Sequence, residues 1–139
     1  MKLWLALLAL TLIVQQPTPR RFVPVTDAML QKPKDADWPM WRRTLDSWGY
    51  SPLNQINRNN VSQLRLAWTR GMIVGGSQES TPLVYDGVMY LPNSGDDIQA
   101  LDGANGDLIW DYQRKLSANG RRSQNRNIAM INRSVHVAL

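Results

Sequence analysis

The clearest pattern of hydrophobic and polar positions lies between residues 83 and 112, where short apolar runs alternate with turn-forming residues. The runs 83–85 and 88–91 flank the pair Asp86-Gly87. This pair favours the two-residue turn of a β-hairpin, which requires positive φ at both positions. Two further runs, 98–101 and 107–112, are joined by a glycine-containing loop. The pattern predicts four short antiparallel strands in one sheet.

The same arrangement recurs on both sides of this sheet. Trp68 and Trp110 lie 42 residues apart, and Trp68 ends the apolar run 64–68, which we expect to be a strand. Downstream, residues 128–137 repeat the pattern of the first hairpin at an interval of 46. Four strands per unit and a period in the forties are typical of β-propeller blades. We predict an all-β propeller fragment, with one complete four-stranded blade at about 81–113 and parts of the two neighbouring blades.

The amino-terminal segment has a different character. After a positively charged start, residues 3–14 are apolar and uncharged. This run of twelve is shorter than the roughly 20 residues that a helix needs to span a bilayer, so no stable membrane span is expected. We interpret residues 1–16 as a secretory signal peptide, with an uncleaved interfacial anchor as the alternative.

The following residues, 17–36, are proline-containing and weakly periodic, which indicates an extended arm with a short helix around 26–31. Residues 37–139 then form the expected propeller part. Its first segment, 37–53, alternates aromatic residues with turn formers and predicts a loop-rich but buried region.

Composition and charge exclude several classes of protein. With 43% hydrophobic and 19% charged residues the chain is typical of a folded globular protein. It has no cysteine, so it forms no disulfide and no thiolate metal site. The net charge of +5 is spread along the chain without a dense basic tract. Solvated loop charges therefore explain it better than a nucleic-acid surface does.

One motif points to a family. Ala100, Asp102, Gly106 and Trp110 fit the pattern Ala-x-Asp-x-x-x-Gly-x-x-x-Trp and resemble the tryptophan-docking motif of quinoprotein alcohol dehydrogenases. In such a motif the Asp and the Gly build a tight turn, and the Trp packs its ring against the adjacent blade. The segments 41–57 and 78–90 are similar to the part of the same family that precedes its first blade and to the start of that blade.

This resemblance implies an eight-bladed propeller that binds pyrroloquinoline quinone with a calcium or lanthanide ion in its central channel. Such enzymes oxidise small alcohols or related substrates in the periplasm and pass the electrons to a cytochrome c. The catalytic and metal-binding residues of the family come from later blades. The resemblance therefore implies the amino-terminal portion of a dehydrogenase, inactive alone, with no catalytic residue and no metal ligand in this chain.

Two residues match cofactor contacts of the family. Glu79 stands where the family places a glutamate that hydrogen-bonds the quinone; its alternative role is a solvated loop glutamate. Arg126 resembles the arginine of an Asn-Arg-Gly segment, although Asn127 replaces the glycine here. A guanidinium suits a polycarboxylate cofactor, but a plain surface arginine is the alternative. His136, the single histidine, favours a packing role in a strand.

Two other interpretations remain open from the sequence. Related repeats also occur in envelope assembly proteins, so the chain could be a non-catalytic β-propeller scaffold of the cell envelope. It could also be an inactive remnant of a truncated or frameshifted reading frame, because the last residue, Leu139, falls inside an expected strand.

Overall fold

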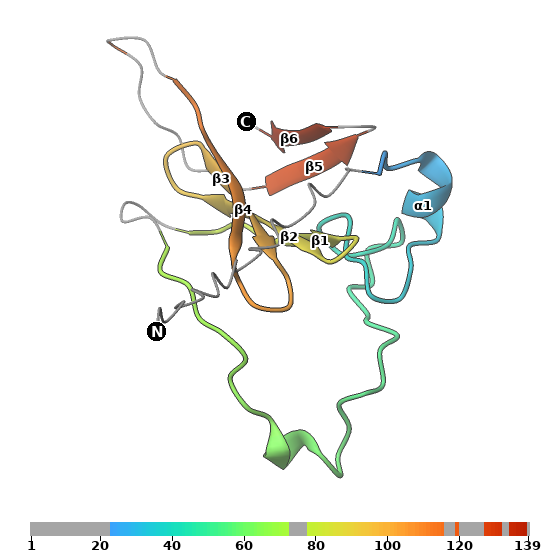
Figure 1. Ribbon diagram of the computed structural model, residues 1–139. Helices are drawn as coiled ribbons and strands as arrows, with labels where there is room; N and C mark the ends of the chain where they lie inside the picture. The colour runs from blue at the N-terminus through green and yellow to red at the C-terminus, as the bar shows by residue number, and fades with distance from the viewer. Residues whose placement is uncertain (1–22, 73–77, 116–118, 120–126, 132–133, 139) are drawn as a thin grey trace, which may run out of the picture.

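A computed structural model describes residues 23–72, 78–115, 119, 127–131 and 134–138, with the backbone alone for 127, 131 and 134–138. Most of the regular secondary structure of the described chain is β-strand, in a four-stranded and a two-stranded antiparallel sheet (Figure 1). The elements are α1 (Asp27–Gln31), the 3-10 helix η1 (Val61–Gln63), β1 (Leu83–Tyr85), β2 (Val88–Asn93), β3 (Asp97–Asp102), β4 (Leu108–Gln113), β5 (Asn127–Ile131) and β6 (Ser134–Ala138).

The four-stranded sheet has the order β1-β2-β3-β4, so each strand pairs with its neighbour in sequence. Asp86 and Gly87 connect β1 to β2 with φ of 50° and 76°. Two positive φ values are what a type I′ turn requires, and the turn brings Tyr85 opposite Val88. The predicted all-β class, both hairpins of this sheet and their order are confirmed.

One face of the sheet forms the core. Leu83, Tyr90, Ala100 and Trp110 lie opposite one another across the four strands; the first three are buried, and Trp110 is 39% exposed at the border of the sheet. Ala100 is 0% exposed, and the rings of Tyr90 and Trp110 on its two sides have centroids 6.0 Å apart. A small residue fits between two aromatic side chains where a larger one would overpack, which explains the alanine of the motif.

The second hairpin joins the same core. β5 and β6 pair antiparallel, with Ile131 opposite Ser134, as the repeat predicted. Ile128 and Met130 are buried in a cluster with residues of the first sheet. The other buried members of this cluster are Val25, Leu83, Tyr85, Val88, Tyr90, Ile98 and Ala100.

The predicted short helix is also present as α1. Thr26 is its N-cap, and its side chain accepts a hydrogen bond from the Met29 amide at 3.4 Å. Met29 and Leu30 pack against the core cluster, so the helix covers part of the sheet.

The free edge of β1 is covered by the segment that precedes the first hairpin. Trp38 forms an antiparallel bridge with Val84, with N–O distances of 2.7 and 2.9 Å. The buried carboxylate of Asp37 accepts a hydrogen bond from the Asp86 amide at 3.0 Å. These contacts attach the segment to both β1 and its turn.

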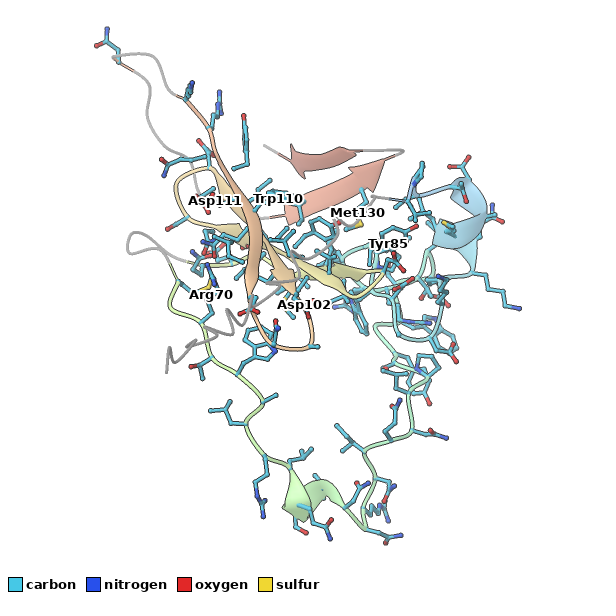
Figure 2. The ribbon with its side chains drawn as sticks, in the orientation of Figure 1. Arg70, Tyr85, Asp102, Trp110, Asp111 and Met130 are labelled. Atoms are coloured by element: carbon cyan, nitrogen blue, oxygen red, sulfur yellow. The ribbon has the colours of Figure 1, made fainter. Side chains whose placement is uncertain are left out.

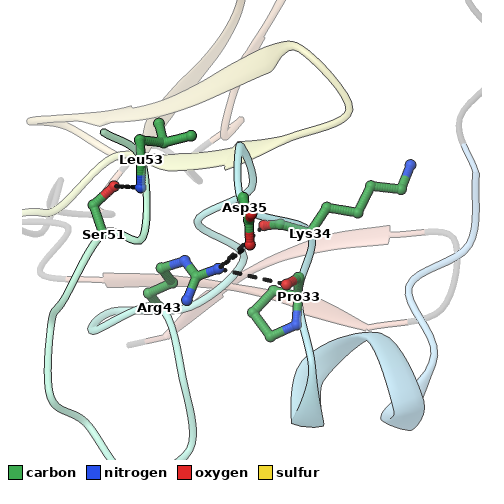
Figure 3. A network of polar contacts seen from close by, with 6 residues as sticks. All are labelled: Pro33, Lys34, Asp35, Arg43, Ser51 and Leu53. Carbon is green, nitrogen blue, oxygen red and sulfur yellow. Dashed lines mark hydrogen bonds and ion pairs between the residues drawn. The ribbon is translucent and has the colours of Figure 1, made fainter. Parts of the chain in front are cut away.

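A buried arginine fixes the same segment from the other side (Figure 3). The Nη2 atom of Arg43 donates to the carbonyl oxygens of Pro33 and Lys34 at 3.4 and 3.3 Å. The same atom lies 3.9 Å from the carboxylate of Asp35. Residues 33–43 thus form an anchored loop, in which the buried guanidinium is hydrogen-bonded to backbone oxygens.

Two expectations are wrong in this structure. The segment 37–53 is not buried as a whole, because Trp48 and Tyr50 are 78% and 69% exposed. Aromatic content predicts burial only where other elements lie alongside, and here the chain leaves the sheet and returns after η1 (Figure 1). Residues 64–68 lie outside both described sheets, although they were expected to be a strand. A strand needs a hydrogen-bonded neighbour, which neither sheet supplies to them.

The buried phenol of Tyr90 predicts a loss of stability in alkali. Burial raises its pKa to about 12, and Tyr85 and Asp86 add electrostatic contributions in the same direction. The unfolded state therefore ionises first, and stability should be constant below about pH 10 and fall as the pH approaches about 12. The urea midpoint measured against pH checks this. Tyr90→Phe should flatten the decline and the exposed Tyr112→Phe should keep it; equal slopes would contradict the assignment.

Candidate functional site

The turn between β3 and β4 is organised by Asp102. Its carboxylate accepts the Ala104 amide at 2.9 Å, and its carbonyl accepts the Gly106 amide at 2.8 Å. Its own amide donates to the Asp107 carbonyl at 2.8 Å. Gly106 has a φ of 76°, a backbone conformation that residues with a Cβ rarely adopt. The role predicted for Asp102 and Gly106 in a tight turn is confirmed.

Trp68 lies directly on this turn. Its indole Nε1 donates to the carbonyl of Gly103 at 3.2 Å. A Cβ placed on Gly106 would be only 2.7 Å from two atoms of the Trp68 ring. The glycine therefore serves two purposes: it permits the positive φ and it leaves room for the indole. The chain before the first hairpin is therefore held to the β3–β4 turn of the sheet.

Arg70 strengthens this attachment. Its Nε donates to the side-chain oxygen of Gln99 at 3.2 Å, and its Nη1 donates to the Gly106 carbonyl at 3.4 Å. Figure 2 shows Arg70 beside the sheet that carries Asp102 and Trp110. Sequence reasoning missed this arginine because nothing in its local sequence distinguishes it from a surface residue.

The last strand of the sheet presents an open apolar surface. All six residues of β4 are exposed, among them Leu108, Ile109, Trp110 and Tyr112. Among the described residues β4 pairs with β3 alone, so its other backbone edge forms the border of the four-stranded sheet.

Glu79 is the sole glutamate of the sequence and lies exposed four residues before β1. The residue after it, Ser80, is partly buried, and its hydroxyl donates to the carbonyl of Pro92 at 3.1 Å. Pro92 is one of the most deeply buried residues of the sheet, next to the end of β2. Glu79 is thus adjacent to an anchored residue at the end of the sheet that also holds the β2–β3 turn.

That end of the sheet is polar and buried. The side-chain amide of Asn93 donates to the carboxylate of Asp97 at 3.2 Å, and both residues are at most 1% exposed. Asp96 is also buried, and its carboxylate lies 3.7 Å from Arg114. Buried carboxylates are stable only with such partners.

A small depression lies between α1 and Tyr85, at the other end of β1 from Glu79. The Tyr85 hydroxyl donates to the Met29 sulfur at 3.5 Å there, and burial, with smaller contributions from Asp86 and Asp37, raises the Tyr85 pKa. Its lining residues are Met29, Lys32, Pro33, Lys34, Asp37, Pro39 and Tyr85, and they do not include Glu79.

Some predicted features cannot be placed. Arg126 and the expected signal segment 1–16 lie outside the described residues. His136 is in β6 opposite Ala129, where the backbone alone is described. Across the described ranges no group of three or more His, Cys, Asp or Glu residues is arranged to hold a metal ion. Within the same ranges no helix has the length and apolarity needed to cross a bilayer.

A four-stranded sheet paired in sequence order, with the preceding segment docked on its β3–β4 turn and a second hairpin in its core, defines a β-propeller blade with its neighbours. Residues 38–137 match the family described as PQQ, "Glucose/ethanol/alcohol dehydrogenase, beta-propeller domain". The chain belongs to this family. The predicted quinoprotein propeller class is thereby confirmed.

Individual sequences and solved structures are consistent with this family assignment. The dehydrogenase subunit of alcohol dehydrogenase (quinone) from Gluconacetobacter polyoxogenes is 43% identical over 83 residues, which is 60% of this chain and 11% of the relative. The solved structure of quinohemoprotein alcohol dehydrogenase ADHIIG from Pseudomonas putida HK5 matches 84% of this chain and 18% of its own, with a TM-score of 0.73 and 32% identity. A europium-containing methanol dehydrogenase matches 78% of this chain and 20% of its own, with a TM-score of 0.66 and 29% identity. The chain thus spans about a ninth of the curated relative.

Proposed function

We propose that this chain forms part of the wall of a pyrroloquinoline quinone site in an alcohol dehydrogenase, with Glu79 as a contact to the cofactor. The observation that carries the proposal is the place of Glu79 in a chain of this family: an exposed carboxylate, four residues before β1, next to an anchored serine. In a propeller the first strand of each blade lines the central channel. A carboxylate just before that strand is well placed to meet a polar ligand.

In this proposal the cofactor supplies the redox chemistry and the chain supplies binding and orientation. The carboxylate of Glu79 accepts a hydrogen bond from the quinone. Arg126 contributes a second, cationic contact to the cofactor's carboxylates. An accepting carboxylate and a donating guanidinium suit a ligand that carries both an N–H group and carboxylates.

The wider setting belongs to the same proposal. Residues 1–16 act as a secretory signal, 17–36 as an arm, and 37–139 as the propeller part in the periplasm. The complete enzyme takes a small alcohol as substrate, calcium or a lanthanide ion in the channel, and a cytochrome c as electron acceptor. Trp68 on the Gly103–Gly106 turn is the docking contact between two blades, and Trp110 on β4 is its counterpart for the next blade.

The proposed function is tested by Glu79→Gln, which keeps the shape of the side chain and removes its charge. We expect the dissociation constant of pyrroloquinoline quinone, measured by titration calorimetry on the purified protein, to rise about tenfold or more because a charge-assisted hydrogen bond is lost. Asp111→Asn, an exposed carboxylate on β4, is the matched control and should bind as tightly as the unchanged protein.

Two results would count against the proposal. Equal affinity of Glu79→Gln and the unchanged protein would remove Glu79 from the site. No binding of pyrroloquinoline quinone by the complete propeller would favour the alternative function, a non-catalytic propeller scaffold of the cell envelope.

A further inference from the structure

The pairing between β1 and β2 stops at a proline. Leu83 lies opposite Tyr90, so a longer β1 would bring Thr81 opposite Pro92. Residue pairs that exchange hydrogen bonds alternate along an antiparallel ladder, and the two-residue turn makes Tyr85–Val88 and Leu83–Tyr90 such pairs. Thr81–Pro92 would be the next, but proline has no N–H to donate. The ladder therefore ends just after the segment that carries Glu79.

A side chain takes over where the ladder ends. The hydroxyl of Ser80 donates to the Pro92 carbonyl at 3.1 Å. Pro92 is among the residues that are less than 2% exposed, so its carbonyl lies in a buried part of the sheet, where it requires a hydrogen-bond donor. Ser80 thus attaches the chain to β2 by one bond, three residues before Leu83, where regular pairing begins.

We infer that Ser80 is a positioning residue for Glu79: its hydroxyl bond to the Pro92 carbonyl fixes the backbone from which Glu79 projects toward the cofactor. This inference rests on the cofactor role proposed for Glu79. The Ser80 bond holds the chain one residue after Glu79, and the regular strand begins only at Leu83.

The physical effect is preorganisation. A carboxylate on an unanchored segment must lose conformational freedom when it binds a ligand, and that loss weakens binding. A segment already fixed by Ser80 loses less. Removal of the hydroxyl should therefore weaken cofactor binding through Glu79, without removal of any group that contacts the cofactor.

Three variants test this inference by titration of the purified protein with pyrroloquinoline quinone. Ser80→Ala should raise the dissociation constant about fivefold, the scale expected when one ordered side chain becomes free. Ser80→Thr keeps the hydroxyl and should restore the affinity to within about twofold. Ser80→Ala made in the Glu79→Gln background should produce no further loss, because the group that it positions has already been changed.

The outcomes separate this inference from the proposed function. If Glu79→Gln leaves the affinity unchanged, the proposed cofactor role fails, whatever the serine variants do. If Glu79→Gln weakens binding while Ser80→Ala does not, the cofactor role stands and the positioning role is overturned. Equal losses on Ser80→Ala with and without Glu79→Gln would also overturn it, since they would assign the effect to general destabilisation.

Discussion

Gly106→Ala is expected to lower the free energy of unfolding by about 2–4 kcal/mol, which is a large part of the stability of a small domain. Two separate costs contribute. The φ of 76° at this position is unfavourable for any residue with a Cβ. The new methyl group would also lie 2.7 Å from ring atoms of Trp68, which must then leave its hydrogen bond to Gly103.

The control for this prediction is Gly49→Ala. Gly49 has a similar φ of 66°, but a Cβ there would meet no atom within 4 Å. This substitution should cost only the conformational term, about 1–2 kcal/mol. Urea unfolding followed by circular dichroism measures both variants. Equal losses would show that Trp68 is not held against Gly106.

A second background isolates the indole. In a Trp68→Ala protein there is no ring above residue 106, so Gly106→Ala should cost no more than Gly49→Ala does. The difference between the two backgrounds is the coupling energy of the contact. A value near zero would also weaken the proposal that Trp68 docks one blade on the next.

Local sequence was sufficient for the features that depend on local chemistry. The Asp86-Gly87 turn follows from two positions that accept positive φ, and the β3–β4 turn follows from the side chain of Asp102 and from Gly106. Both signals lie within a few residues of the structure that they specify. The strands on either side then follow from alternation between apolar and polar residues.

Features that depend on distant neighbours were not predictable in this way. The aromatic residues at 48 and 50 looked like core residues, yet their exposure is decided by which other elements lie against them. Residues 64–68 have a strand pattern, but only a paired neighbour makes a strand. Trp68 still reaches its turn, because an indole and a glycine are sufficient for that contact.

The candidate site also combines features that the sequence indicates with features that only the structure reveals. Glu79 was identified from the resemblance to a family, while Ser80 was missed because a serine before Thr81 and Pro82 looks like an ordinary loop residue. A signal was present in the sequence: Pro92 interrupts the strand pattern of β2 and denies β1 a donor. The partner of its carbonyl, Ser80, could be found only from the structure.

Leu83→Ala should lower the stability of the protein strongly and leave its cofactor affinity unchanged, whereas Ser80→Ala should do the reverse. Leu83 is 1% exposed in the core cluster, on the strand that follows the Glu79 segment. Its truncation leaves a cavity and should cost about 2–5 kcal/mol of unfolding free energy. Leu66→Ala, at a leucine that is 79% exposed, should cost less than about 0.5 kcal/mol and serves as the control.

Cofactor affinity gives the second half of this comparison. Leu83 faces the core and contacts no proposed ligand, so the folded Leu83→Ala protein should bind pyrroloquinoline quinone as tightly as the unchanged protein when both are measured well below their unfolding temperatures. Ser80→Ala, in contrast, should weaken binding with a smaller change in unfolding midpoint, because one partly buried hydrogen bond contributes only about 1 kcal/mol. If both variants lose affinity in proportion to their loss of stability, the end of β1 acts on the site only through folding, and Ser80 has no positioning role of its own.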